Sequence, residues 1–306
     1  MKKNHVFLPA LLCTALWGSA IPAVKTGYEW FAIAADDIPA KLFFAGCRFT
    51  LAGILVLLFV LSRRKVSICP KKDAWPGILL LSSAQTIMQY IFFYWGLGST
   101  TGVRGSVLSA TSTFFAVLVA HFAFADDRLT IRKGVGCVIG FAGVVVILSS
   151  AGLGGQGVHL TGEGFMLFSA VGQGLGAAIS RKITPGRDPM VITGWQLAFG
   201  GMVLLVLGAV LGGAGGVTFT AKGGVFLLYL AFLSAVAFTV WTILLRDNPV
   251  GRVTIYMFLI PVFGSLLSAL FLQENVFTLR NLCALLLVCA GIAAVNFQSE
   301  KAAKCG

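Results

Sequence analysis

Charged side chains are scarce in this chain of 306 residues: Asp, Glu, Lys and Arg together make up only 11% of it. An average soluble domain is about a quarter charged. Acidic residues are the scarcest, with 11 Asp and Glu against 23 Lys and Arg, while 58% of all residues are hydrophobic. This balance excludes an ordinary soluble enzyme and a disordered chain, and it predicts a protein that crosses the membrane several times.

Motifs for metals, disulfides and nucleic acids are missing as well. The seven cysteines are an odd number, most of them lie inside apolar runs, and none shows the paired spacing of a zinc site. A net charge of +12 would point to nucleic acid in a soluble protein, but here the basic residues separate apolar runs, as loop anchors do. We therefore expect no metal, no cofactor, no nucleic acid and no obligate protein partner. The expected partners are a small-molecule substrate and the lipid bilayer.

The apolar residues gather in ten runs, each about long enough to cross a bilayer, which takes roughly 20 residues of helix. The runs are continuous rather than alternating, and a helix satisfies its own backbone hydrogen bonds in lipid, so we expect an all-α fold. The sixth run is the shortest, with 17 residues between Glu163 and Arg181. The expected spans are residues 6–26, 40–61, 75–97, 102–124, 132–150, 163–181, 190–212, 223–245, 253–272 and 280–298.

The basic residues are distributed unevenly between the two sides of this topology. With the N-terminus inside, 17 Lys and Arg fall on the inner side and 5 on the outer side, and Arg48 lies within a span. Cytoplasmic loops carry the excess of Lys and Arg in membrane proteins. The sequence thus predicts cytoplasmic N- and C-termini in a plasma membrane, which is the inner membrane in a bacterium.

The two halves of the chain are similar to each other, without gaps, at an offset of 148 residues. Each half holds five expected spans, and because five is odd, the halves must be inverted relative to each other in the membrane. We expect a first repeat at 1–150, a Gly-rich linker at 151–162 and a second repeat at 163–306. The matched positions include Gly46 with Gly194, Gly53 with Gly201, Leu57 with Leu205, Phe115 with Phe263, Asp126 with Glu274, and Gly143 with Gly291.

This organisation resembles the EamA family of the drug/metabolite transporter superfamily. The resemblance covers nearly the whole chain and implies ten helices around a central cavity, with export or exchange of small metabolites, often amino acids. Where the family often has Pro in the fourth span, this chain has Thr113, opposite Pro261. The residues that carry the resemblance are Trp17-Gly18, Pro261, the acidic helix ends Asp126-Asp127 and Gln273-Glu274-Asn275, and the later glycines Gly143 and Gly291.

Arg48 is the most informative polar residue, because it lies deep within its span. An Arg at the bilayer centre costs roughly 2.5–3.5 kcal/mol on insertion scales. No Asp or Glu occupies the middle of any expected span, so Arg48 has no evident buried partner and strong ion coupling is not expected. Two interpretations stay open: Arg48 attracts a substrate carboxylate, or it reaches water or backbone carbonyls.

Further candidates for substrate contact are amides, a hydroxyl and deep aromatic rings. Each of them could instead pack or bond against a neighbouring helix. Pro22 and Pro261 remove a backbone hydrogen bond inside a span, and we expect them to act as hinges. The candidate binding residues are Trp17, Arg48, Gln85, Gln89, Ser109, Gln173, Trp241 and Tyr256.

These features predict a transporter that moves small amphipathic metabolites, above all amino acids, out of the cell by alternating access through a central cavity. Carriers of sugar phosphates or nucleotide sugars should hold more intramembrane cations, and carriers of cationic drugs should hold an embedded acid, so these classes are the alternatives. A membrane-embedded acyltransferase is a weaker alternative, because its His121 and Asp126 lie five positions apart, about 140° around a helix. We expect no catalytic residue and no enzymatic activity.

Overall fold

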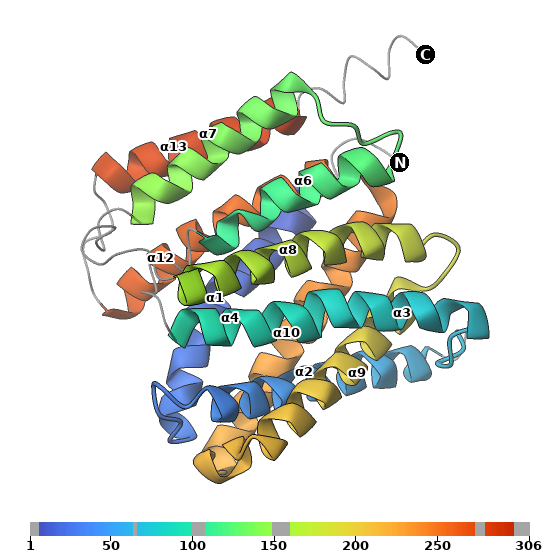
Figure 1. Cartoon of the computed structure of the whole chain (residues 1–306), viewed down its shortest axis with the longest axis vertical. Coiled ribbons are helices and arrows are strands. Elements are labelled where there is room, and N and C mark those ends of the chain that lie inside the picture. Colours follow the sequence, from blue (N-terminus) through green and yellow to red (C-terminus); the bar gives the residue numbers. More distant parts are fainter. Residues whose placement is uncertain (1–5, 64–65, 99–107, 149–159, 273–278, 297–306) are drawn as a thin grey trace.

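The computed structural model describes residues 6–63, 66–98, 108–148, 160–272 and 279–296, and all regular structure in these ranges is helical (Figure 1). Two of the expected spans change helix type along their length. The third consists of α3 (Trp75–Ser82), the π-helical segment η2 (Ser83–Met88) and α4 (Gln89–Gly98), and the ninth consists of α11 (Val250–Thr254), the 3₁₀ segment η5 (Ile255–Phe258) and α12 (Leu259–Leu272). The other helices are α1 (Phe7–Trp30), α2 (Ile38–Ser62), α6 (Ser112–Ala123), α7 (Ile131–Leu148), α8 (Leu160–Ile183), α9 (Pro189–Val210), α10 (Ala221–Asp247) and α13 (Leu279–Asn296), with short 3₁₀ turns η1 (Lys72–Ala74) and η4 (Gly213–Gly216).

A helix overlaps each of the ten expected spans. Within the described ranges, five helical segments are long and apolar enough to cross a membrane, and three further apolar helices are shorter. The helices therefore lie where the hydropathy pattern places them, while ten complete crossings remain a prediction. The five long segments are Phe7–Trp30, Ile38–Ser62, Lys72–Gly96, Pro189–Val210 and Ala221–Asp247, and the shorter ones are Leu108–Ala123, Val250–Gly264 and Leu282–Val295.

The junction between the two halves is described only in part. Most of the expected linker, 151–159, lies outside the described residues, as do 102–107 of the fourth span, Gln273-Glu274-Asn275, and 297–298 of the tenth span. Helix α8 begins at Leu160, three residues before the expected start of the second repeat. Glu163 lies in the first turn of α8, where a negative side chain stabilises the start of a helix.

Side-chain caps fix the starts of three long helices. The Asp37 carboxylate accepts a hydrogen bond from the Ala40 N–H at the start of α2, and the Asp188 carboxylate accepts one from the Met190 N–H at the start of α9. The Thr220 hydroxyl accepts the Gly223 N–H at the start of α10. These acceptors satisfy backbone donors that a helix start leaves unpaired, which is why the helices begin at these points.

Helices α2 and α9, the second and seventh expected spans, pack closely and run antiparallel. A Cβ added to Gly46 would lie 2.2 Å from the backbone nitrogen of Leu205, and a Cβ added to Gly194 would lie 2.7 Å from Leu57 Cδ2. Gly46 matches Gly194, and Leu57 matches Leu205, at the repeat offset of 148. The two contacts are therefore equivalent by the repeat: in each, a glycine of one half packs against the matching leucine position of the other half.

The same exchange occurs between α7 and α13, the fifth and tenth expected spans. Gly143 packs against Ala284 of α13, and its equivalent Gly291 packs against Gly136, which is the equivalent of Ala284. Helix α1 packs on α10 and α12, just as α8 packs on the third-span helices and α6. These reciprocal antiparallel contacts fit an architecture of two repeats related by a pseudo-two-fold axis.

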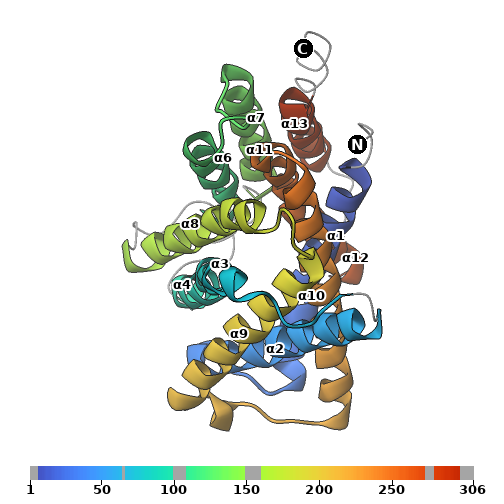
Figure 2. The same ribbon diagram turned by 90° about the vertical axis from the view of Figure 1, so that its right-hand side faces the viewer.

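The paired helices lie at the two ends of the long axis of the molecule, with α7 and α13 at one end and α2 and α9 at the other (Figures 1 and 2). A large apolar core joins α7 and α13 to α1, α6, α10 and α11, and it includes Val117, Trp241 and Phe258. A second core lies around α2, α9, α4 and α10 and includes Phe49, Tyr94 and Phe238. Helices α1 and α10 contribute side chains to both cores and so connect the two ends.

Candidate substrate-binding site

Arg48 is buried in α2, with 6% of its surface exposed. Its Nε donates a hydrogen bond of 2.8 Å to Ser234 Oγ on α10, and the Ser234 hydroxyl donates in turn to the Leu230 carbonyl of its own helix. The guanidinium lies 5.0 Å from the centre of the Phe49 ring. In the described part of the chain no carboxylate lies within ion-pair distance of Arg48, so the cation keeps N–H donors for another anion.

Three tyrosines from two other helices lie within electrostatic range of Arg48: Tyr28 on α1, and Tyr90 and Tyr94 on α4. The hydroxyls of Tyr28 and Tyr94 are hydrogen-bonded to each other. The Tyr90 ring lies 4.5 Å from the Phe49 ring, so it packs on the same ring that Arg48 stacks over. Phenol hydroxyls and a guanidinium are both donors, and together they suit a carboxylate or another small anion.

Aromatic rings continue from this group to the opposite core. Phe49 lies 6.0 Å from Phe238, Phe238 lies 5.5 Å from Trp17, and Trp17 lies 5.0 Å from Trp241, all in edge-on contact. Trp241 is buried with 1% exposed, and Trp17 is partly buried between the two cores. The structure therefore brings three of the predicted residues, Arg48, Trp17 and Trp241, into one connected group, which we call the Arg48 cluster.

The predicted amides lie elsewhere. Gln85 lies in the π-helical segment and packs against Gly176 of α8, and the Gln89 backbone lies beside Gly172 of the same helix. The Gln89 side-chain oxygen is buried without a hydrogen-bond partner, and Gln173 is partly buried on α8. The Gln85 side chain and the Gln89 backbone therefore lie in the contact between the third span and α8.

Two further candidates do not join the Arg48 cluster. The Ser109 hydroxyl is buried without a hydrogen-bond partner, just before α6. Tyr256 is buried in the core of α7 and α13, and its ring lies 6.2 Å from Phe7 at the start of α1. Tyr256 shares this core with Trp241, but its ring contact is with Phe7 and not with the rings of the Arg48 cluster.

The two candidate hinges differ in their surroundings. Helix α1 continues from Phe7 to Trp30 through Pro22. Pro261 lies in the first turn of α12, directly after the change from α-helix to 3₁₀ helix at Ile255–Phe258. The irregular backbone is therefore next to Pro261 and not next to Pro22. The π-helical segment in the third span is a second irregularity, and neither segment has a clear signal in the sequence.

The residues of the acyltransferase alternative have separate partners. His121 Nδ1 accepts a hydrogen bond of 3.0 Å from the Leu129 N–H, which ties the end of α6 to the following loop. Asp126 pairs with Arg181 at 2.5 Å. Both side chains therefore stabilise the loop after α6, and the geometry gives them no shared catalytic arrangement.

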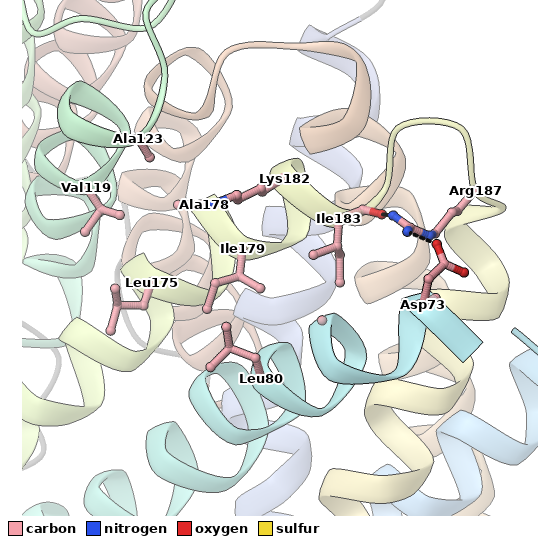
Figure 3. Close-up of a pocket in the computed structure, with 12 residues that line it drawn as sticks. Asp73, Leu80, Val119, Ala123, Leu175, Ala178, Ile179, Lys182, Ile183 and Arg187 are labelled. Atoms are coloured by element: carbon pink, nitrogen blue, oxygen red, sulfur yellow. Dashed lines mark hydrogen bonds and ion pairs between the residues drawn. The ribbon is translucent and has the colours of Figure 1, made fainter. Parts of the chain in front are cut away.

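Two cavities of the described structure lie away from the Arg48 cluster. The larger, of about 450 Å³, lies between α3, α6 and α8, where Leu80 and Ile179 face each other and the Asp73–Arg187 ion pair closes one end (Figure 3). The second, of about 380 Å³, lies between the loops before η1 and before α9. Neither is lined by a predicted site residue, so the central cavity remains a prediction.

Sequence reasoning missed Tyr28, Tyr94 and Ser234. Three helices far apart in the chain contribute these side chains, and only the packing of α1, α4 and α10 around α2 places them beside Arg48. The only signal in the sequence was the buried cation itself, whose N–H donors require acceptors from other helices of the bundle.

Comparisons with known proteins agree with this architecture. The model of the EamA-like transporter family matches residues 6–149 and, again, residues 160–297. YvbV of Bacillus subtilis, an uncharacterized transporter, is 31% identical over 315 residues, which cover 100% of this chain and 97% of YvbV. The Escherichia coli K12 protein named "Probable amino-acid metabolite efflux pump" is 28% identical over 313 residues, or 97% of each chain. A crystal structure with 19% identity superposes with a TM-score of 0.79 over 98% of this chain and 99% of that chain, which shows the same fold.

Proposed function

Because the chain belongs to the EamA-like transporter family and is a multi-pass membrane protein, we propose that it exports small amphipathic metabolites, above all amino acids. The Arg48 cluster carries this proposal. A buried cation that lacks a protein carboxylate is costly to keep in a membrane unless an anion or a set of acceptors compensates it. The carboxylate of an amino acid supplies that anion, and because the Tyr28 and Tyr94 hydroxyls bond to each other, one of their two protons is left to donate to it.

The aromatic part of the cluster accounts for the rest of the substrate. Phe49, Phe238, Trp17 and Trp241 form a row of rings that starts at the guanidinium. Apolar or aromatic side chains of a substrate gain contact area and edge-on ring contacts against such a row. The E. coli relative is named for amino-acid metabolites, which supports the same class of substrate.

Transport proceeds by alternating access between the two halves. All ten helices cross the membrane, both termini lie in the cytoplasm, and the chain resides in a plasma membrane, which is the inner membrane in a bacterium; the uneven split of Lys and Arg supports this orientation. Residues 1–150 and 163–306 are the two inverted repeats, and they rock around the segments that contain Pro22 and Pro261. The reciprocal contacts of α2 with α9 and of α7 with α13 give both repeats the same packing at their ends.

Counterflow tests this proposal. Purified protein is reconstituted in liposomes that are each preloaded with one unlabelled amino acid, and uptake of a labelled amino-acid mixture is followed with and without a pH gradient. We expect exchange with apolar or aromatic amino acids and no effect of the gradient. Absence of exchange from folded protein would overturn the substrate class, and sugar phosphates and cationic drugs would be tested next.

The Arg48→Ala variant shows whether the cluster binds the substrate. We expect it to fold and to lose exchange, because the substrate carboxylate loses its counter-charge. Arg63→Ala is the matched control, since Arg63 lies just past the end of the same helix and its side chain is exposed. Normal exchange by Arg48→Ala at normal abundance would contradict a carboxylate role for this residue.

A further inference from the structure

An ion-pair cluster ties the loop between α6 and α7 to the second half of the chain. Asp127 lies in this loop, and its side chain is fully buried. Lys133 at the start of α7 donates a hydrogen bond of 2.6 Å to Asp127 Oδ1, and Arg181 of α8 approaches Asp127 Oδ2 at 3.4 Å. The backbone N–H of Gly251 in α11 donates to the same Oδ2 at 3.2 Å. One carboxylate therefore bonds groups from both halves.

Arg181 strengthens this link by holding several groups of the first half together. Its Nη2 donates to Asp126 at 2.5 Å while its Nη1 faces Asp127, and its guanidinium lies 4.4 Å from the centre of the Phe124 ring. Only 13% of the Arg181 side chain is exposed. A partly buried Arg that bonds two carboxylates and stacks on a ring is held in one geometry, which a Lys could not reproduce.

Three charged members of the cluster match neutral residues of the other half, whereas Asp126 matches Glu274. At the repeat offset of 148, Asp127 matches Asn275, Lys133 matches Asn281, and Arg181 matches Ile33. The halves exchange their apolar contacts, yet the sequence has no charge at the positions that match Asp127, Lys133 and Arg181. By the predicted topology, the charged side is the cytoplasmic one.

From these bonds between the two halves we propose that Asp127, Lys133 and Arg181 form an ionic latch that holds the cytoplasmic end of the transport path closed. The inference rests on the alternating access of the proposed function. In this structure the latch is formed, and directly beneath it Val117 of α6 packs against Gly251 of α11. Opening toward the cytoplasm separates α6 from α8 and α11, so it must break the bonds of Asp127 and rehydrate three charges.

The consequence is a free-energy cost on the step that opens the path toward the cytoplasm. A substrate that enters from the cytoplasm must offset the cost of breaking the latch through contacts that favour the open state.

Thiol accessibility tests the latch without any substrate. In a variant without natural cysteines, Val117→Cys places a reporter on the buried face that the latch covers. The rate of its modification by a maleimide is measured in permeabilised membranes. We expect Arg181→Gln to raise this rate at least about fivefold, the lower end of usual coupling effects. Asp127→Asn should do the same, because it removes the charge while its amide oxygen can still accept from Gly251.

Arg246→Gln is the matched control. Among the described residues Arg246 forms its ion pair with its neighbour Asp247 on the same helix, and it lies on the same predicted side of the membrane. Its loss removes one cation without removing a bond of Asp127. We expect a rate within twofold of the parent. An unchanged rate in folded Arg181→Gln and Asp127→Asn would overturn the latch, even if counterflow succeeds. A raised rate would uphold it even if amino acids prove to be the wrong substrate.

Discussion

Ser234 shows how one hydroxyl can set the position of a buried cation. Arg48 Nε donates to Ser234 Oγ, and the Ser234 hydroxyl is itself anchored to the Leu230 carbonyl. Hydrogen bonds to charged groups contribute about 1.5–3 kcal/mol. The guanidinium is thus oriented by α10, although it belongs to α2.

We expect Ser234→Ala to raise the KM for exchange by about tenfold or more, since a loss of 1.4 kcal/mol is a factor of ten. The maximal rate should change less, because the charge of Arg48 remains. Thr239→Val on the same helix is the control, as the Thr239 hydroxyl is buried without a hydrogen-bond partner. Equal KM values for the two variants in liposome exchange would contradict the positioning role of Ser234.

Single residues were only partly predictable from the sequence. Arg48 could be singled out because the free-energy cost of a charged side chain inside a span follows from its residue type and position alone. Trp17 and Trp241 contact each other and connect to Arg48 through a row of rings, but Gln89 and Tyr256 lie in other contacts. A polar or aromatic residue inside a span can face any of several neighbouring helices. Only tertiary packing decides which of them it contacts, and so what role it has.

At the level of helices, the contact between α2 and α9 depends on glycines that meet different kinds of atoms. A Cβ on Gly46 would lie 2.2 Å from the Leu205 nitrogen, which is backbone, whereas a Cβ on Gly194 would meet the end of the Leu57 side chain. Backbone cannot move without displacing α9, but a side chain can rotate. The two equivalent glycines are therefore not equally replaceable.

We expect Gly46→Ala to lower thermal stability more than Gly194→Ala, with a cost at or above the upper end of about 1–3 kcal/mol for overpacking. Gly134→Ala, on α7 with no atom within 4 Å of the added Cβ, should be neutral or stabilising by up to about 1 kcal/mol from helix propensity. Unfolding in detergent, followed by the fluorescence of the Trp residues, ranks the three variants. A ranking with Gly194→Ala as the least stable would contradict the packing argument.

The helices themselves were predicted well, and their irregular centres were not. Each expected span overlaps a helix because a long apolar run in lipid has few other ways to satisfy its backbone. The π-helical turn at Ser83–Met88 and the 3₁₀ turn at Ile255–Phe258 depend on contacts with other helices. Hydropathy is averaged over a span and does not register a local change of hydrogen-bond pattern.

For the whole molecule, the distribution of Lys and Arg predicts which side of the membrane each loop occupies. The loop after α2 belongs to the predicted cytoplasmic side, and its Cys69 is exposed. In a variant that keeps only this cysteine, an impermeant maleimide should label inside-out vesicles and leave intact cells unlabelled. Strong labelling of intact cells would reverse the orientation and place the ionic latch on the outer side.

The sequence by itself determined the properties that depend on each segment alone. Hydropathy gives the helices, the offset of 148 gives the two halves, and the basic residues give an orientation to test. Only the tertiary structure brought Tyr28, Tyr94 and Ser234 to Arg48, and placed Asp127 between Lys133 and Arg181. The physical reason is that burial and transfer from water act on each segment alone, whereas hydrogen bonds and ion pairs need two groups whose meeting depends on how distant helices pack.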